Sequence, residues 1–182
     1  DAAGNLYTNN NQFDYEAANA HTINVRATDA SGDSVTVITS IQVDNVNEAP
    51  NELTISGSLA VNENAGAGQT VASVSANDPE YQAITYALSG SDAQYFELDQ
   101  YNNILTNGSF NYEDKSSYNF SVEATDSEGL TTTEPVTVNV LNMSEAPTTL
   151  VYSGGLAVDE TTVAGAVIAS FSALDPDEKP LV

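Results

Sequence analysis

A repeat of 97 residues constrains the fold of this chain more than any other feature of its sequence. The segments LAVNENAGAG and LAVDETTVAG begin at Leu59 and Leu156, and the motifs ATDASG and ATDSEG place Asp29 and Asp126 the same distance apart. The segments NEAP and SEAP share this spacing. Because three separate landmarks have one period, the sequence indicates a tandem array of similar units.

The repeat divides the chain into three parts. Residues 51–147 form one complete copy, residues 1–50 match the C-terminal half of a preceding copy, and residues 148–182 match the N-terminal portion of a following copy. We therefore expect the chain to be a segment of a longer array.

Short stretches of alternating apolar and polar residues fill the complete copy, and Gly, Asn, Asp and Pro separate them. In EPVTVNVLN, for example, Val136, Val138 and Val140 fall on one face of a strand. Such alternation is typical of half-buried strands, and no segment has a helical period over three turns. The pattern predicts an all-β fold of tandem antiparallel β-sandwiches with Greek-key connections, with about seven strands per repeat.

Acidic residues dominate the charge of the chain. It has 26 acidic and 3 basic residues, which give a formal net charge of −23. This charge disfavours nucleic acid and anionic membrane surfaces as partners. Cations fit better, because two carboxylates about 4 Å apart repel each other by about 4 kcal/mol at an effective dielectric constant near 20. A solvated acidic surface is the plainer alternative.

The acids cluster in the predicted turns. In the complete copy they are Glu63, Asp78, Glu80, Glu113, Asp126 and Glu145, and their counterparts in the flanking copies are Glu160, Asp175, Asp177, Asp14, Glu16, Asp29 and Glu48. Calcium takes six to eight oxygen ligands in flexible geometry, whereas zinc would need histidine or cysteine. The chain has one histidine and no cysteine. The sequence therefore predicts calcium sites.

The ordered series LAVNENAG, ANDPE, ITYALSGSDAQYFELDQYNNILT, FNYED, VEATDSEG and SEAP resembles the cadherin repeat, in the divergent form found in large bacterial surface adhesins. The series spans the whole complete copy. The resemblance implies an extracellular, secreted or cell-surface location, with calcium bound between successive repeats.

Carried over to this sequence, the resemblance implies one set of calcium ligands at each junction. The first junction would use Asp14, Glu16, Asn47, Glu48, Glu63, Asp78, Glu80 and Asp126. The second would use Asn111, Glu113, Ser144, Glu145, Glu160, Asp175 and Asp177. Because Asn111 stands where the preceding copy has Asp14, we expect fewer or weaker ions at the second junction.

The function expected from these features is a calcium-rigidified spacer or adhesion module rather than an enzyme. Its partners would be calcium ions and neighbouring repeats of the same chain, without direct membrane insertion. Two alternatives stay open. A carbohydrate-binding module could use Tyr81, Tyr95 and Tyr101 to bind a cell-surface glycan. A filament could form if the partial copies complement one another between chains, because an unpaired strand edge can pair with another chain.

Overall fold

The computed structural model describes residues 4–8, 13–155 and 157–177. The chain forms two compact units, which are described separately below. Unit 1 comprises Asp1–Leu53, Ala76–Thr85 and Ala124–Thr132, and unit 2 comprises Thr54–Ser75, Tyr86–Glu123 and Thr133–Val182. The predicted repeat boundaries are not tested by this division and stay a prediction.

The regular structure of the described residues consists of strands and one 3-10 turn, which confirms the all-β fold class. The strands are β1 (Ala20–Thr28), β2 (Ser34–Gln42), β3 (Asn51–Gly57), β4 (Ala60–Asn62), β5 (Thr70–Asn77), β6 (Thr85–Ser89), β7 (Phe96–Leu98), β8 (Asn103–Thr106), β9 (Ser117–Thr125), β10 (Thr131–Leu141), β11 (Thr148–Gly154) and β12 (Ala169–Leu174). One 3-10 turn, η1 (Ala93–Tyr95), precedes β7. In these residues no helix has the length and apolarity needed to cross a bilayer.

The complete copy contains two four-stranded sheets, ordered β4-β10-β9-β6 and β3-β5-β8-β7. Strand β4 pairs with the end of β10 in parallel, with Val61 opposite Val140, so this pair departs from the predicted antiparallel arrangement. The parallel pairing carries the residues after β4 to the end of β10. This placement determines which acids meet in unit 2.

The core of unit 2 lies where the faces of the two sheets meet. Phe96 of β7 packs on Phe120 of β9, with ring centroids 4.7 Å apart, and Phe110 meets Tyr118 edge-on at 4.9 Å. Val136, Val138 and Val140 of β10 are buried as their alternation predicted, and Val122 of β9 is buried as well. This apolar interior holds the strand ends, and with them the acidic turns, in fixed places.

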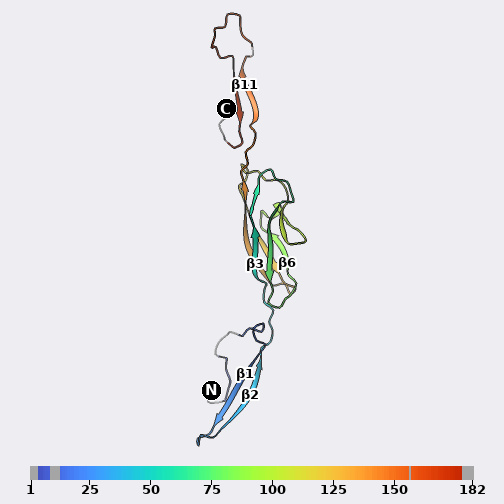
Figure 1. Ribbon diagram of the computed structural model, residues 1–182, viewed down its shortest axis with the longest axis vertical. Helices are drawn as coiled ribbons and strands as arrows, with labels where there is room; N and C mark the ends of the chain where they lie inside the picture. The colour runs from blue at the N-terminus through green and yellow to red at the C-terminus, as the bar shows by residue number, and fades with distance from the viewer. Residues whose placement is uncertain (1–3, 9–12, 156, 178–182) are drawn as a thin grey trace. The chain divides into compact units, whose positions relative to one another are not determined.

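Unit 1 contains the hairpin β1–β2, shown in blue in Figure 1. The strands are antiparallel and in register, with Val25 opposite Val37. The turn between them is held by Asp29, whose carboxylate accepts the backbone N–H groups of Ser31 and Asp33, and Gly32 has a positive φ of 94°. Such a turn favours an Asp at its first position and glycine where φ is positive.

Equivalent glycines show that two copies begin with the same backbone packing. A Cβ at Gly57 would lie 2.3 Å from the carbonyl oxygen of Val71, and one at Gly154 would lie 2.6 Å from that of Ile168. The two glycines are 97 residues apart. Strands β3 and β5, and likewise β11 and β12, can approach this closely only because glycine has no side chain.

Candidate metal centres

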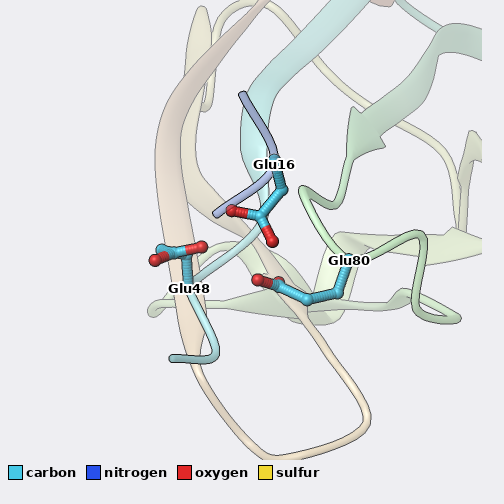
Figure 2. A group of neighbouring side chains, drawn as sticks. All are labelled: Glu16, Glu48 and Glu80. Carbon is cyan, nitrogen blue, oxygen red and sulfur yellow. The ribbon is translucent and has the colours of Figure 1, made fainter. Parts of the chain in front are cut away.

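Three glutamates from distant parts of the sequence meet in unit 1. Glu16 follows FDY before β1, Glu48 lies in the linker after β2, and Glu80 lies in the loop between β5 and β6. Their carboxylate oxygens lie within 4.8 Å of one another, and Figure 2 shows the three carboxylates turned toward a common point. We call this cluster the first centre.

The crowding raises the pKa of Glu48 above its ordinary value. A proton shared with Glu80 is the main cause, followed by burial and the negative charges of Glu80, Glu16 and Asp14. When both glutamates are ionised, no hydrogen-bond donor of the described residues reaches either carboxylate oxygen of Glu80. A bound cation would relieve this repulsion.

Asp78 adds a buried oxygen to the same region. Its side chain is 7% exposed, and Oδ1 accepts the backbone N–H groups of Glu80 at 3.1 Å and Gln82 at 2.9 Å. Its other oxygen, Oδ2, is buried and meets no donor among the described residues. A buried carboxylate oxygen without a partner is costly, so this atom fits a role as a cation ligand.

Asp126 and Asn47 approach this region from the β9–β10 turn and the linker. Asp126 is 5% exposed, and its Oδ2 accepts a hydrogen bond from Nδ2 of Asn47 at 2.7 Å. Burial alone would raise the pKa of Asp126, but the bond from Asn47 and the backbone N–H groups of Leu130 and Glu128 lower it. Asp126 is therefore held as a carboxylate by hydrogen bonds.

An open cavity of about 980 Å³ adjoins the first centre within unit 1. Its lining includes Glu16 and Glu48 of the centre, together with Asp14 and Asp78. Asp14 itself shapes the turn before β1, because its Oδ1 accepts the N–H of Ala17 at 2.9 Å. Solvent and ions can therefore reach the carboxylates from this side.

A second cluster of three acids lies in unit 2. The carboxylate oxygens of Glu63, Glu113 and Asp177 lie within 4.8 Å of one another, and we call this cluster the second centre. Glu63 is 3% exposed and accepts the backbone N–H groups of Met143 at 2.5 Å and Tyr112 at 2.9 Å. These two hydrogen bonds lower the pKa of Glu63.

The pKa of Glu113 moves in the opposite direction. A backbone hydrogen bond at this residue lowers it, but burial and the negative charges of Glu63 and Glu145 outweigh that bond and raise the pKa. Amide side chains form hydrogen bonds with these acids. Asn142 donates to Glu113 at 3.1 Å, and Asn64 donates to Glu145 at 2.5 Å. In the second centre, repulsion between the carboxylates is thus combined with hydrogen bonds from nearby amide side chains.

The two centres contain equivalent residues. Glu16 and Glu113 are 97 positions apart, and so are Glu80 and Asp177. The supporting turn also recurs, since Asn111 accepts the N–H groups of Glu113 and Asp114, as Asp14 accepts that of Ala17. Two successive copies therefore bring an equivalent pair of acids together twice, one acid from each copy.

The third carboxylate differs between the two centres, and our sequence-based assignment of Glu63 to the first junction was wrong. We expected Glu63 at the first junction, but it joins Glu113 and Asp177 in unit 2. The parallel pairing of β4 with β10 explains this, because the N–H of Glu63 continues the pairing by donating to the carbonyl of Leu141. Side-chain alternation cannot tell which strand a short edge strand joins.

Several other predicted ligands lie near the second centre without entering the cluster of three. The N–H of Glu145 donates to Oδ2 of Asp177 at 2.8 Å, and Asp175 accepts the N–H of Asp177 at 2.9 Å. Ser144 lies in the linker next to Glu145. Glu160 is exposed and belongs to neither centre among the described residues.

Sequence analysis missed the amide residues that surround both centres. Asn64, Asn142 and Gln82 each donate to a predicted ligand or to another acid. No local signal marks them, because their partners lie 29 to 81 positions away in the sequence. Both centres offer only oxygen ligands, which suits a hard cation such as calcium.

Comparisons with known proteins agree with the predicted resemblance. Residues 58–141 match the family model of the cadherin domain. Protocadherin gamma-A4 of Pan troglodytes is 35% identical over 127 residues, which cover 65% of this chain and 14% of that protein. The chain thus spans about a seventh of this curated relative.

Solved structures of protocadherins have a similar fold. The extracellular cadherin domains 1-5 of protocadherin gamma B2 match with a TM-score of 0.64 and 27% identity, over 90% of this chain and 33% of that one. Domains 1-4 of protocadherin gamma B7 match with a TM-score of 0.66 and 25% identity, over 90% and 42%. The curated relative is an animal protein, so it does not support the expected bacterial source.

Proposed function

On the premise that the chain is cadherin-like and not an enzyme, with the cadherin domain at residues 58–141, we propose that it is an extracellular spacer or adhesion module stiffened by calcium. One observation carries the proposal. Two clusters of three carboxylates, built on the equivalent pairs Glu16 with Glu80 and Glu113 with Asp177, recur at the repeat spacing.

The residues of each centre come from separate segments of the chain, so a shared ion would tie these segments together. In unit 1 the segments are the turn before β1, the linker after β2 and the loop after β5. Calcium supplies positive charge and accepts oxygens in flexible geometry. The chain's own part is to hold Glu16, Glu48 and Glu80 close together and to keep the buried oxygen of Asp78 free for a ligand role.

The proposed partners are calcium ions, neighbouring repeats and a second copy of the protein. Self-association is supported by the cis-dimer structure of protocadherin gammaB7, whose sequence is 26% identical to this chain. A source in a bacterial surface protein stays a prediction from the linker motifs.

A glycan as partner also stays a prediction. Of the three tyrosines considered for sugar binding, Tyr81 is 95% exposed and Tyr101 is 73% exposed, so both could stack on a ligand. Tyr95 instead packs edge-on against Tyr118, with ring centroids 4.9 Å apart. This contact favours a structural role for Tyr95.

The proposal is tested by calcium titration calorimetry together with thermal melting in calcium and in EDTA. Extracellular modules bind calcium with dissociation constants of about 0.1 to 1 mM. A ligand at a hundredfold excess over its dissociation constant stabilises the folded state by about 2.7 kcal/mol, which corresponds to roughly 5 to 10 °C for a chain of this size.

Paired variants identify the ligands. Glu16→Gln and Glu113→Gln should each remove one class of sites, whereas Glu97→Gln, an exposed position outside both centres, should leave binding unchanged. If the protein binds no calcium at millimolar concentration and melts identically in EDTA, the acids are a solvated surface and the proposal fails.

A further inference from the structure

A chain of amide hydrogen bonds in unit 1 runs through Gln82. The amide nitrogen of Gln82 donates to Oδ1 of Asn47, and the amide nitrogen of Asn47 donates to Oδ2 of Asp126 at 2.7 Å. On its other side, Oε1 of Gln82 accepts the hydroxyl proton of Ser127. The chain therefore connects the linker, the loop after β5 and the β9–β10 turn.

The backbone of Gln82 belongs to the same region. Its N–H donates to Oδ1 of Asp78 at 2.9 Å, and its amide nitrogen also lies 3.3 Å from a carboxylate oxygen of Glu128. Gln82 thus contacts Asp78 through its main chain and Asn47 through its side chain. Its position is set independently of any ion.

The direction of these bonds conflicts with cation ligation by Asn47. A cation needs an oxygen, but Asn47 presents its NH₂ group to Asp126 and turns its oxygen toward Gln82. An amide nitrogen has two donors and no acceptor. Asn47 and Asp126 can therefore share an ion only after the amide of Asn47 has turned over.

The side chain of Gln82 can adjust when the amide of Asn47 turns over. A primary amide has an acceptor on one side and donors on the other, and a hydroxyl can both donate and accept. If both amides turn over, Gln82 accepts from Asn47 through Oε1, and its nitrogen donates to the hydroxyl of Ser127. Every bond between these three side chains is then reversed and kept. Turnover breaks only the bond that the nitrogen of Gln82 donates to Glu128.

We propose that Asn47 and Gln82 form an amide relay, in which Gln82 is a positioning residue that holds the linker without calcium and turns over when calcium binds. The inference rests on the proposed calcium function and explains how the metal-free linker keeps its place. The bond from Gln82 to Glu128 must break before the relay turns over, so the relay lowers calcium affinity while it preserves order.

The full chain is titrated with calcium chloride and followed by NMR at the amide signals of residues 45–48, which report the first centre alone. Gln82→Met removes the hydrogen bonds but keeps the length of the side chain, and calcium affinity should rise about threefold because the bond to Glu128, which opposes turnover, is lost. Gln82→Glu can only accept, so it favours the metal-bound setting and should raise affinity about tenfold. Gln94→Met, an exposed glutamine bonded to Ser91, is the matched control and should change nothing.

The same two Gln82 variants are also measured in an Asn47→Ala protein. This separates the effect of the relay on calcium affinity from the effect of the charge that Gln82→Glu adds. In that background Gln82→Met should have no effect, and Gln82→Glu should keep only the part due to its added charge. In the wild-type protein, the side-chain NH₂ signals of Asn47 and Gln82 should both shift on calcium addition.

The possible failures are distinct. If wild-type protein binds no calcium, both the relay and the proposed function are overturned. If it binds calcium, but Gln82→Met leaves the affinity unchanged and the Asn47 and Gln82 signals do not move, the relay alone is overturned.

Discussion

The first and second centres contain equivalent acids but stabilise them differently. In the first centre, both oxygens of Glu80 lack a hydrogen-bond donor among the described residues, and so does Oδ2 of the adjacent Asp78. In the second centre, Glu63 accepts two backbone N–H groups and Glu113 accepts an amide proton from Asn142. The first centre therefore depends more on an external cation.

The third carboxylate of each centre accounts for this difference. Glu48 lies in an exposed linker and shares a proton with Glu80, whereas Glu63 is buried at the end of β4 beside the N–H groups of Tyr112 and Met143. A carboxylate that accepts backbone N–H bonds is stabilised in its ionised form without metal. Removing an acid should thus have opposite effects on the two centres in EDTA.

The largest effect is expected for Glu63→Gln. The new amide can accept only one of the two N–H bonds and points a donor at the other, so a buried N–H loses its partner. Melting in EDTA should occur about 5 to 10 °C lower than in wild type. Glu97→Gln serves as the control, and an unchanged melting temperature would contradict the anchoring role of Glu63.

Glu80→Gln should have the reverse effect in EDTA. When Glu48 and Glu80 are both ionised, the substitution removes a negative charge without breaking a hydrogen bond, so at neutral pH the metal-free protein should melt about 1 to 3 °C higher. Calcium affinity at the first centre should fall about tenfold because a charged ligand is lost. A lower melting temperature in EDTA would show that Glu80 has a structural partner.

The third carboxylates of the two centres, Glu48 and Glu63, should also titrate on opposite sides of the ordinary glutamate pKa of 4.5. The raised pKa of Glu48 means that its stabilising contribution is present at low pH and is lost as the pH rises through that pKa. The lowered pKa of Glu63 means that its contribution is present above pH 4.5 and is lost as the pH falls through that pKa.

Carboxyl carbon NMR in EDTA measures both groups directly. Glu48 should titrate above 4.5 and Glu63 below it, and calcium should abolish the upward shift of Glu48 because a cation replaces the shared proton. Equal pKa values for the two groups would remove the electrostatic distinction between the centres.

The smallest effect is expected for Asn111→Asp. Asn111 uses its side-chain oxygen to accept the N–H groups of Glu113 and Asp114, and an aspartate can make the same bonds. The added charge should raise calcium affinity at the second centre about threefold with little change in stability. Asp14→Asn is the reciprocal variant and should weaken the first centre, whereas no change in either variant would show that this position does not influence the ion.

Much of the fold could be predicted because its signals are local. Alternation placed Val136, Val138 and Val140 on one face of a strand, and all three are buried in β10. The acidic residues in the turns could be predicted as well, because Asp, Asn and Gly mark turns and can be read directly from the sequence.

The repeat itself identified the equivalent acids in successive copies, such as Glu16 with Glu113 and Glu80 with Asp177. By itself, the sequence therefore determined the all-β fold class, the 97-residue period and the acidic character of the turns, since each depends on neighbouring residues or on simple spacing. Only the tertiary structure decided that Glu63 joins the second centre and that Gln82 contacts Asn47. The physical reason is that strand pairing and amide orientation depend on contacts between segments far apart in the chain, which no local pattern records.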